Sequence, residues 1–229
     1  MENNGIDFPL HRAAGDGDLG LVKSLVAEGA EVNVKNKGDC TPPDILVFQK
    51  THVATKTIEE KFEICAPCLM WAVTLHQFQL AKERTEKGVK FKNIPFRDIK
   101  LSYFVKVINL AGAHVKMGGD IVDFVDFFVD DDWLSYDEAA VKEWIADPPE
   151  AIPLLRAFRD ELAMQKNFSP TVLEKLMQRF IEVKQIDVNQ IIHALRVAVT
   201  GKSVGLGMFE TLEILGKKRV LRRIDRALL

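Results

Sequence analysis

Two cysteines stand close together in Cys65-Ala66-Pro67-Cys68, and this spacing is the pattern in the sequence most directly suited to covalent or metal chemistry. In thiol-redox proteins such a pair lies at a helix N-terminus, which lowers the pKa of the first thiol. The pair would also form half of a zinc site, with Cys40 and His76 as further ligands. No β-α-β pattern surrounds it and no second C-x-x-C follows, so we expect two cysteines on a buried helix stripe.

The C-terminal end of the chain carries a second group of candidate residues, which are positively charged. From residue 202 onward there are seven basic residues against three acidic ones, although the whole chain has a formal net charge of −2. Such asymmetry is typical of a surface that binds a polyanion, and a solvated helix face gives the same pattern. The basic residues are Lys202, Lys217, Lys218, Arg219, Arg222, Arg223 and Arg226.

An acidic segment from Asp120 to Asp132 is the counterpart of the basic end. Its carboxylates alternate with phenylalanines, as in Asp123-Phe124 and Asp126-Phe127. On one helix this pattern would place the carboxylates outward and the aromatic rings inward. We therefore expect a solvated acidic face, which would repel RNA, and not a metal site.

The residues after Leu195 follow a specific order: Leu195-Arg196-Val-Ala-Val-Thr200-Gly201, a short glycine-containing loop, then Gly207-Met-Phe-Glu-Thr-Leu-Glu-Ile-Leu-Gly216 and a basic last helix. This order resembles the C-terminal anticodon-binding domain of bacterial-type glutamyl-tRNA synthetases. The resemblance extends, more faintly, over about residues 120 to 229, including the Tyr136-Asp137 stretch.

The resemblance implies an all-α, α-helix-cage bundle in which the loop after Thr200-Gly201 and the next helix hold unstacked anticodon bases. Synthetases commonly have a polar residue and then Pro-Gly-Leu where this chain has Gly205-Leu206-Gly207-Met208, so Gly205 offers a base no side chain. Lysines and arginines of the last helix could contact phosphates. The expected RNA-binding residues are Arg196, Lys202, Ser203, Gly205, Gly207, Met208, Lys217, Lys218, Arg219, Arg222 and Arg223.

Motifs for amino-acid activation are missing from these 229 residues. None of the five histidines lies in a HIGH-like tetrapeptide, and no KMSKS-like loop or glycine-rich phosphate-binding turn is present. We therefore expect no catalytic residue, no cofactor and no enzymatic activity. The leading hypothesis is a non-catalytic tRNA-binding module, and the alternative is a protein-interaction or structural module that keeps the helical fold without binding RNA.

Residues 5 to 48 resemble a single ankyrin repeat, with Pro9-Leu10-His11 at its start and a second Thr41-Pro42 that follows at the ankyrin period of 33 residues. One repeat cannot bury its own faces, because arrays need about three units. Since ankyrin arrays usually bind proteins, the segment is a candidate contact for a protein partner, although a single unit favours the alternative, a purely structural role. We divide the chain into an ankyrin-like segment (1–50), an unassigned helical connector (51–96) and the anticodon-binding-like domain (97–229).

The spacing of apolar residues predicts helices throughout the remainder. We expect a helix over 57–87 that ends or kinks at Pro67, and another over 97–116. Ser169-Pro170 predicts a helix start, with an N-cap residue followed by proline at the first helical position. Without a basic, apolar leader or an apolar run of about 20 residues, the sequence predicts a cytoplasmic protein that makes no membrane contact.

Overall fold

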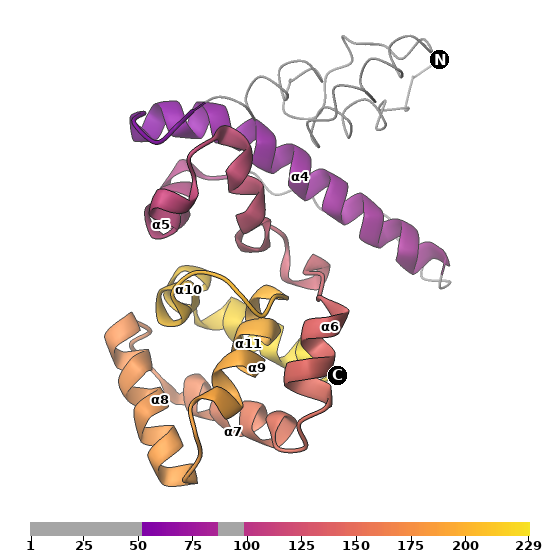
Figure 1. Cartoon of the computed structure of the whole chain (residues 1–229), viewed down its shortest axis with the longest axis vertical. Helices are drawn as coiled ribbons and strands as arrows, with labels where there is room; N and C mark the ends of the chain where they lie inside the picture. The colour runs from indigo at the N-terminus through magenta and orange to yellow at the C-terminus, as the bar shows by residue number, and fades with distance from the viewer. Residues whose placement is uncertain (1–51, 87–98) are drawn as a thin grey trace. The chain divides into compact units, whose positions relative to one another are not determined.

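The computed structural model describes residues 52–86 and 99–229 (Figure 1). The ankyrin-like segment and Cys40 lie outside the described residues. Within the described ranges the backbone forms helices and connecting loops, and the only β-type pairing there is an isolated antiparallel bridge between His52 and Met117. The all-α fold class is confirmed. Of the described helices, none is long and apolar enough to cross a membrane.

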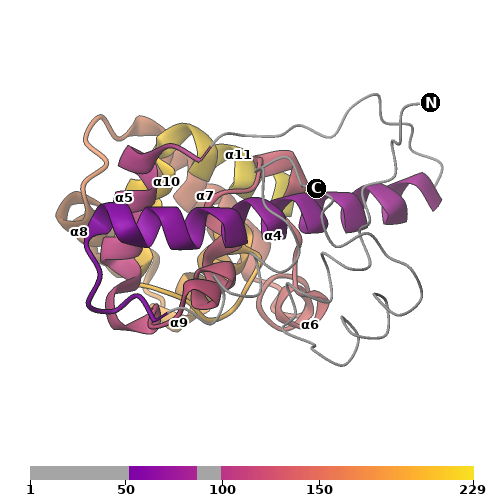
Figure 2. The ribbon, with the colours of Figure 1, turned by 90° about the horizontal axis from the view of Figure 1, so that it is seen from above.

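The chain divides between Val129 and Asp130 into two compact units. In the first unit the long helix α4 (Ile58–Glu86), seen lengthwise in Figure 2, packs against η2 (Gly118–Phe127) and α5 (Leu101–Ala111). Phe62 of α4 meets Phe104 of α5 edge to face, with ring centroids 5.2 Å apart. A short helix, η1 (Gly112–His114), follows α5.

Helix α4 continues through Pro67, so of the two expected effects of the proline, an end or a kink of the helix, the end is wrong. A proline inside a helix removes one backbone hydrogen bond and costs about 3 kcal/mol. The side chains of Cys65, Cys68 and Leu69 are all fully buried around it. Burial of these side chains where α4 packs against η2 offsets the cost of the proline. The pattern of neighbouring residues in the sequence does not reveal this burial.

The acidic segment is not one solvated helix, and that prediction is also corrected. Its first part is the 3-10 helix η2, broken by a non-helical residue at Phe124. Asp126 and Asp131 are buried, with exposed fractions of 5% and 8%. Asp120 accepts hydrogen bonds from the backbone amides of Lys116 and Met117, at 2.9 and 2.8 Å. The carboxylates are therefore used to fix turns and, as described below, to bind arginines.

The second unit is a helical bundle. Helices α7, α9 and α11 pack on one another, α8 packs on α7 and α10, and α6 packs on α9. Helices α6 and α8 lie on opposite sides of this group (Figures 1 and 2). In chain order the elements are η3 (Asp131–Trp133), α6 (Glu138–Val141), the π-helical turn η4 (Lys142–Ala146), α7 (Ala151–Met164), α8 (Pro170–Lys184), α9 (Asn189–Thr200), α10 (Met208–Leu215) and α11 (Lys217–Ala227).

Helix α8 begins at Pro170, as the sequence predicts, with Ser169 as its extended N-cap residue. The apolar stripe of this helix is buried through Leu173, Leu176, Met177 and Phe180. On the other side of α7, a bidentate ion pair joins Arg159 to Asp225 of α11 at 2.7 and 2.8 Å. The ion pair joins α7 to α11, and both of these helices pack on α9, which leads into the loop described next.

Candidate nucleic-acid interface

Helix α9 leads into the predicted RNA-binding loop, and most of its length is buried. Apolar residues Ile191, Leu195 and Val197 through Val199 fix it inside the bundle. The positions that reach the surface are Asn189, Gln190, Ile192, His193 and Arg196. Arg196 is therefore the last surface residue of α9 before the loop.

The Thr200-Gly201 pair ends α9 and fixes the direction in which the loop leaves. Gly201 has a left-handed backbone, with φ of 80°, and a Cβ there would collide with the carbonyl oxygen of Ser135. The Gly201 carbonyl accepts a hydrogen bond from the backbone amide of Asp137 at 2.9 Å. The Thr200 hydroxyl donates to the Arg196 carbonyl at 2.9 Å, and its oxygen accepts a hydrogen bond from the backbone amide of Lys202, the first loop residue, at 3.3 Å. Both residues thus hold the backbone of the loop in place.

The loop 202–207 is also supported from behind by Arg196. Its Nη1 donates a hydrogen bond to the Leu206 carbonyl at 2.7 Å. Burial lowers the pKa of this guanidinium, but arginine keeps its charge at neutral pH. A Cβ at Gly205 would come within 3.2 Å of the same Nη1, so a side chain there would press on Arg196.

The tip of the loop faces solvent. Val204 is 76% exposed, and Gly205 and Gly207 are exposed beside it. Lys202 and Ser203 are partly exposed. Met208, in contrast, is buried as the first residue of α10, so it supports the loop and cannot touch RNA without rearrangement. Val204 is not among the RNA-binding residues expected from the sequence, although an exposed apolar residue in a glycine-containing loop is a signal for such a contact.

The basic helix α11 is largely bound to the rest of its own unit. Arg223 is fully buried, and its Nε donates to Oδ1 of Asp131 at 2.8 Å while Nη1 donates to the Val199 carbonyl at 2.6 Å. Arg219 donates to the same carboxylate oxygen at 2.9 Å. Burial alone would raise the pKa of Asp131, but the two guanidinium groups outweigh it and hold the pKa below its ordinary value. Arg223 has no surface from which it could contact a phosphate.

The neighbouring basic residues have similar roles. Arg222 forms an ion pair with Asp132 at the surface. Arg226 donates to the Asp131 carbonyl at 2.8 Å and lies over the ring of Tyr136, 5.1 Å from its centroid. Lys217 Nζ donates to the carbonyls of Ala163 and Gln165 at the end of α7.

Of the predicted phosphate contacts on α11, Lys218 therefore stands out as an exposed lysine. The others lie in or beside the network that joins α11 to η3 and to the end of α7. The candidate RNA surface is therefore the α9–α10 loop together with Lys218 and with Arg222, which is exposed in its surface ion pair with Asp132.

The cysteine pair lies in surroundings that disfavour a thiolate. Cys65 is fully buried, and burial raises its pKa to about 12. Cys68 is also fully buried, and its Sγ donates to the Ile64 carbonyl at 3.6 Å. Metal binding and thiol exchange both need the thiolate. Among the described residues, no group of three or more His, Cys, Asp or Glu side chains could hold a metal ion.

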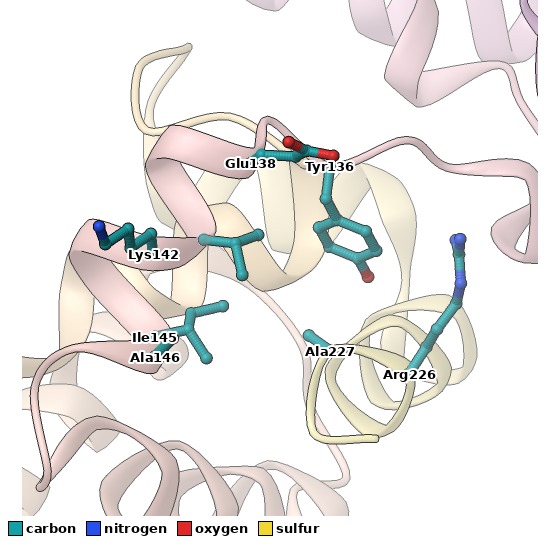
Figure 3. A pocket seen from close by; sticks show the side chains of 8 residues that line it. Tyr136, Glu138, Lys142, Ile145, Ala146, Arg226 and Ala227 are labelled. Carbon is teal, nitrogen blue, oxygen red and sulfur yellow. The ribbon is translucent and has the colours of Figure 1, made fainter.

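A hollow of about 450 Å³ opens between α6, η4 and the end of α11 (Figure 3). Its walls are mainly apolar, and the Ile145 side chain points toward Tyr136 across it. Burial raises the pKa of Tyr136, whose hydroxyl donates to backbone carbonyls of α9 or α11. The lining residues are Tyr136, Glu138, Val141, Lys142, Ile145, Ala146, Arg226 and Ala227.

A family model described as "Anticodon binding domain" matches residues 76–228, which is more than half of the chain. The chain belongs to the anticodon-binding-domain family. The match confirms the resemblance seen in the sequence and extends it toward the N-terminus. A second model, for the ankyrin repeat, matches residues 7–37 and confirms the ankyrin-like start.

Similar proteins with this anticodon-binding domain include two bacterial glutamate–tRNA ligases. The ligase 2 of Pseudothermotoga lettingae is 34% identical over 215 residues, which cover 92% of this chain and 45% of the ligase. The ligase 2 of Caldicellulosiruptor saccharolyticus is 31% identical over 144 residues, 63% of this chain and 29% of the ligase. The chain thus spans less than half the length of these relatives.

A glutamate tRNA ligase from Elizabethkingia meningosepticum, crystallised with its amino acid, has a similar fold. The TM-score is 0.51 at 19% identity, over 70% of this chain and 31% of that one. This likeness supports the helical fold of the anticodon-binding domain.

Proposed function

We propose that this chain is a tRNA-binding module without catalytic activity, which reads unpaired anticodon-loop nucleotides at the α9–α10 loop. The observation that carries the proposal is the way the loop is held. Thr200, Gly201 and Arg196 fix its backbone from behind, while Val204 and Gly205 are displayed to solvent. A preorganised loop of this kind can contact a splayed base without paying for its own ordering.

Each part of the loop has a separate role in the proposal. Val204 provides an apolar contact for the face of a base, and the backbone at Gly205 offers hydrogen-bonding groups to its edge. Lys202 and Ser203 flank the tip with a charge and a hydroxyl. Lys218 contacts phosphate. Because Gly205 has no side chain, we expect weak discrimination among bases.

The absence of catalysis is proposed from the chain's own residues, since the 229 residues contain no HIGH-like or KMSKS-like motif. Activation of an amino acid would then depend on residues outside these 229. The ankyrin-repeat segment is the candidate contact for a protein partner. We propose that the module acts in the cytoplasm, where tRNAs are charged.

One observation favours the alternative function, a protein-interaction or structural module. Arg219 and Arg223 are paired with the buried Asp131, and Arg222 is paired with Asp132 at the surface, so the charge available for RNA is smaller than the sequence suggests. Under this alternative, the helical cage is kept for its shape and no RNA binds.

A gel shift with total tRNA at several salt concentrations separates the two functions. We expect binding that weakens steeply with salt and is reduced in a Lys202→Glu/Lys218→Glu variant, because phosphate contacts release counterions. The matched control is Lys175→Glu/Lys184→Glu, two exposed lysines on α8. Absence of binding at low salt, or equal loss in both variants, would favour the alternative.

A further inference from the structure

Trp144 and His193 form an aromatic stack on the second unit. Their ring centroids are 4.1 Å apart and the ring planes differ by 26°, which is a face-to-face arrangement. Both side chains are partly exposed. Neither residue belongs to the α9–α10 loop or to the arginine network around Asp131, so the stack has no role in the site described above.

The backbone at Trp144 is unusual. Trp144 lies in η4, a five-residue π-helical turn that directly follows α6. The turn packs against both α7 and α9, and its next residue, Ile145, is buried. A π-helical turn is rare and is found frequently at functional sites. Here it places the indole against α9, where it stacks on His193.

The stack lies on the same face of α9 as Arg196. The surface positions Asn189, Ile192, His193 and Arg196 follow the i, i+3, i+4, i+7 spacing of one helical stripe. None of the four is acidic. The axial distance from His193 to Gly201 is about 12 Å, from a rise of about 1.5 Å per residue. A few nucleotides of extended strand can cover this distance.

We propose that Trp144 and His193 form a platform on which a further unpaired base of the bound RNA stacks. The RNA strand then runs along the α9 stripe, from the loop tip past Arg196 to the aromatic pair. Stacking on aromatic rings accepts any base, which suits a loop that lacks a discriminating side chain at Gly205. The platform rests on the proposed function, because it adds contacts to an RNA that the loop already holds.

The test is equilibrium binding of single-stranded RNAs of increasing length to the full chain and to four variants. The variants are Trp144→Leu, His193→Leu, His193→Phe and, as an exposed control on α8, Val183→Ser. We expect Trp144→Leu and His193→Leu to weaken binding of the longer RNAs by about fivefold to a hundredfold, since stacking contributes about 1–3 kcal/mol per base. The shortest RNAs, which fill only the loop, should bind all variants equally.

His193→Phe keeps a flat ring and should bind longer RNAs nearly as the unchanged chain does, which separates stacking from a mere loss of folding. Circular dichroism checks the helical content of each variant. Tryptophan fluorescence of the unchanged chain should fall when a longer RNA binds, and this change should be much smaller in Trp144→Leu.

Two other results would overturn the inference in distinguishable ways. If RNA binds and Lys202→Glu/Lys218→Glu weakens it, while Trp144→Leu and His193→Leu bind as the unchanged chain does, the platform is wrong and the proposed function stands. If the unchanged chain binds no RNA of any length, the proposed function fails and the platform fails with it.

Discussion

The fully buried guanidinium of Arg223 lies with its Nε 2.8 Å from Oδ1 of Asp131, across 92 residues of sequence. This ion pair joins the end of the bundle to its beginning, because Asp131 is the second residue of the second unit and Arg223 lies in its last helix. The positive charge of Arg223, expected from the sequence to contact RNA, is therefore in the interior of the bundle. The consequences of this pairing can be measured.

Removing one member of the pair should destabilise the bundle strongly. We expect Arg223→Met to lower the free energy of unfolding by about 3–5 kcal/mol, because Asp131 would keep a buried charge with one partner fewer. Arg222→Ala, at an exposed ion pair, should cost no more than about 1 kcal/mol. Urea unfolding measures the change in the free energy of unfolding for each variant. Equal changes would show that the buried Arg223–Asp131 pair contributes no more to stability than the exposed Arg222–Asp132 pair.

The same pair predicts how stability depends on pH. The pKa of Asp131 is lower in the folded chain than its ordinary value of 3.8. A carboxylate shifted in this direction contributes its stability above the unfolded pKa and loses it as the pH falls through the folded pKa. The free energy of unfolding should therefore fall between roughly pH 5 and pH 2, and less steeply in Asp131→Asn. If the free energy of unfolding depended on pH with the same slope in the unchanged chain and in Asp131→Asn, the lowered pKa would not belong to Asp131.

Gly201 should tolerate no side chain. Its φ of 80° disfavours L-residues, and a Cβ would collide with the Ser135 carbonyl. We expect Gly201→Ala to lower the free energy of unfolding by about 2 kcal/mol or more, from strain and collision together. A suitable comparison is Gly216→Ala, which has φ of 77° but no atom near its Cβ position, and should cost less. Thermal unfolding of the two variants tests the order.

The thiols of Cys65 and Cys68 should be unreactive in the folded chain. Burial raises the pKa of Cys65 to about 12, so almost no thiolate forms at pH 8. A Cys40→Ser variant leaves these two thiols for a colorimetric thiol reagent to detect. We expect slow reaction in buffer and fast reaction in urea. Rapid labelling of the folded chain would reopen the redox and zinc interpretations of the pair.

The sequence predicted those helix ends that are determined by residues adjacent in the chain. Ser169-Pro170 marks the start of α8 because proline fits the first position of a helix. Proline also disfavours helical backbone angles at the residue before it, here the extended Ser169. The loop after Thr200-Gly201 was expected from the family resemblance, and in the structure Gly201 ends α9 in the left-handed region, where a glycine commonly follows a helix.

Long-range pairing was beyond local reasoning. Asp131 and Arg223 each look like members of solvated charged segments, and only the packing of η3 against α11 brings them together. The continuation of α4 through Pro67 depends in the same way on the surface buried against η2. Trp144 was not identified either, because a π-helical turn has no clear sequence pattern.

The central claim, that the α9–α10 loop contacts tRNA, is tested most directly by comparing two matched double variants. Val204→Asp/Lys202→Glu changes the loop, and Val183→Asp/Lys175→Glu makes the same chemical changes on α8, where Val183 is 73% exposed against 76% for Val204. The measurement is the dissociation constant for tRNA at one fixed, low salt concentration. We predict that the loop variant binds at least tenfold more weakly, a loss of about 1.4 kcal/mol, while the α8 variant binds as the unchanged chain does. Equal binding by both variants would contradict the claim.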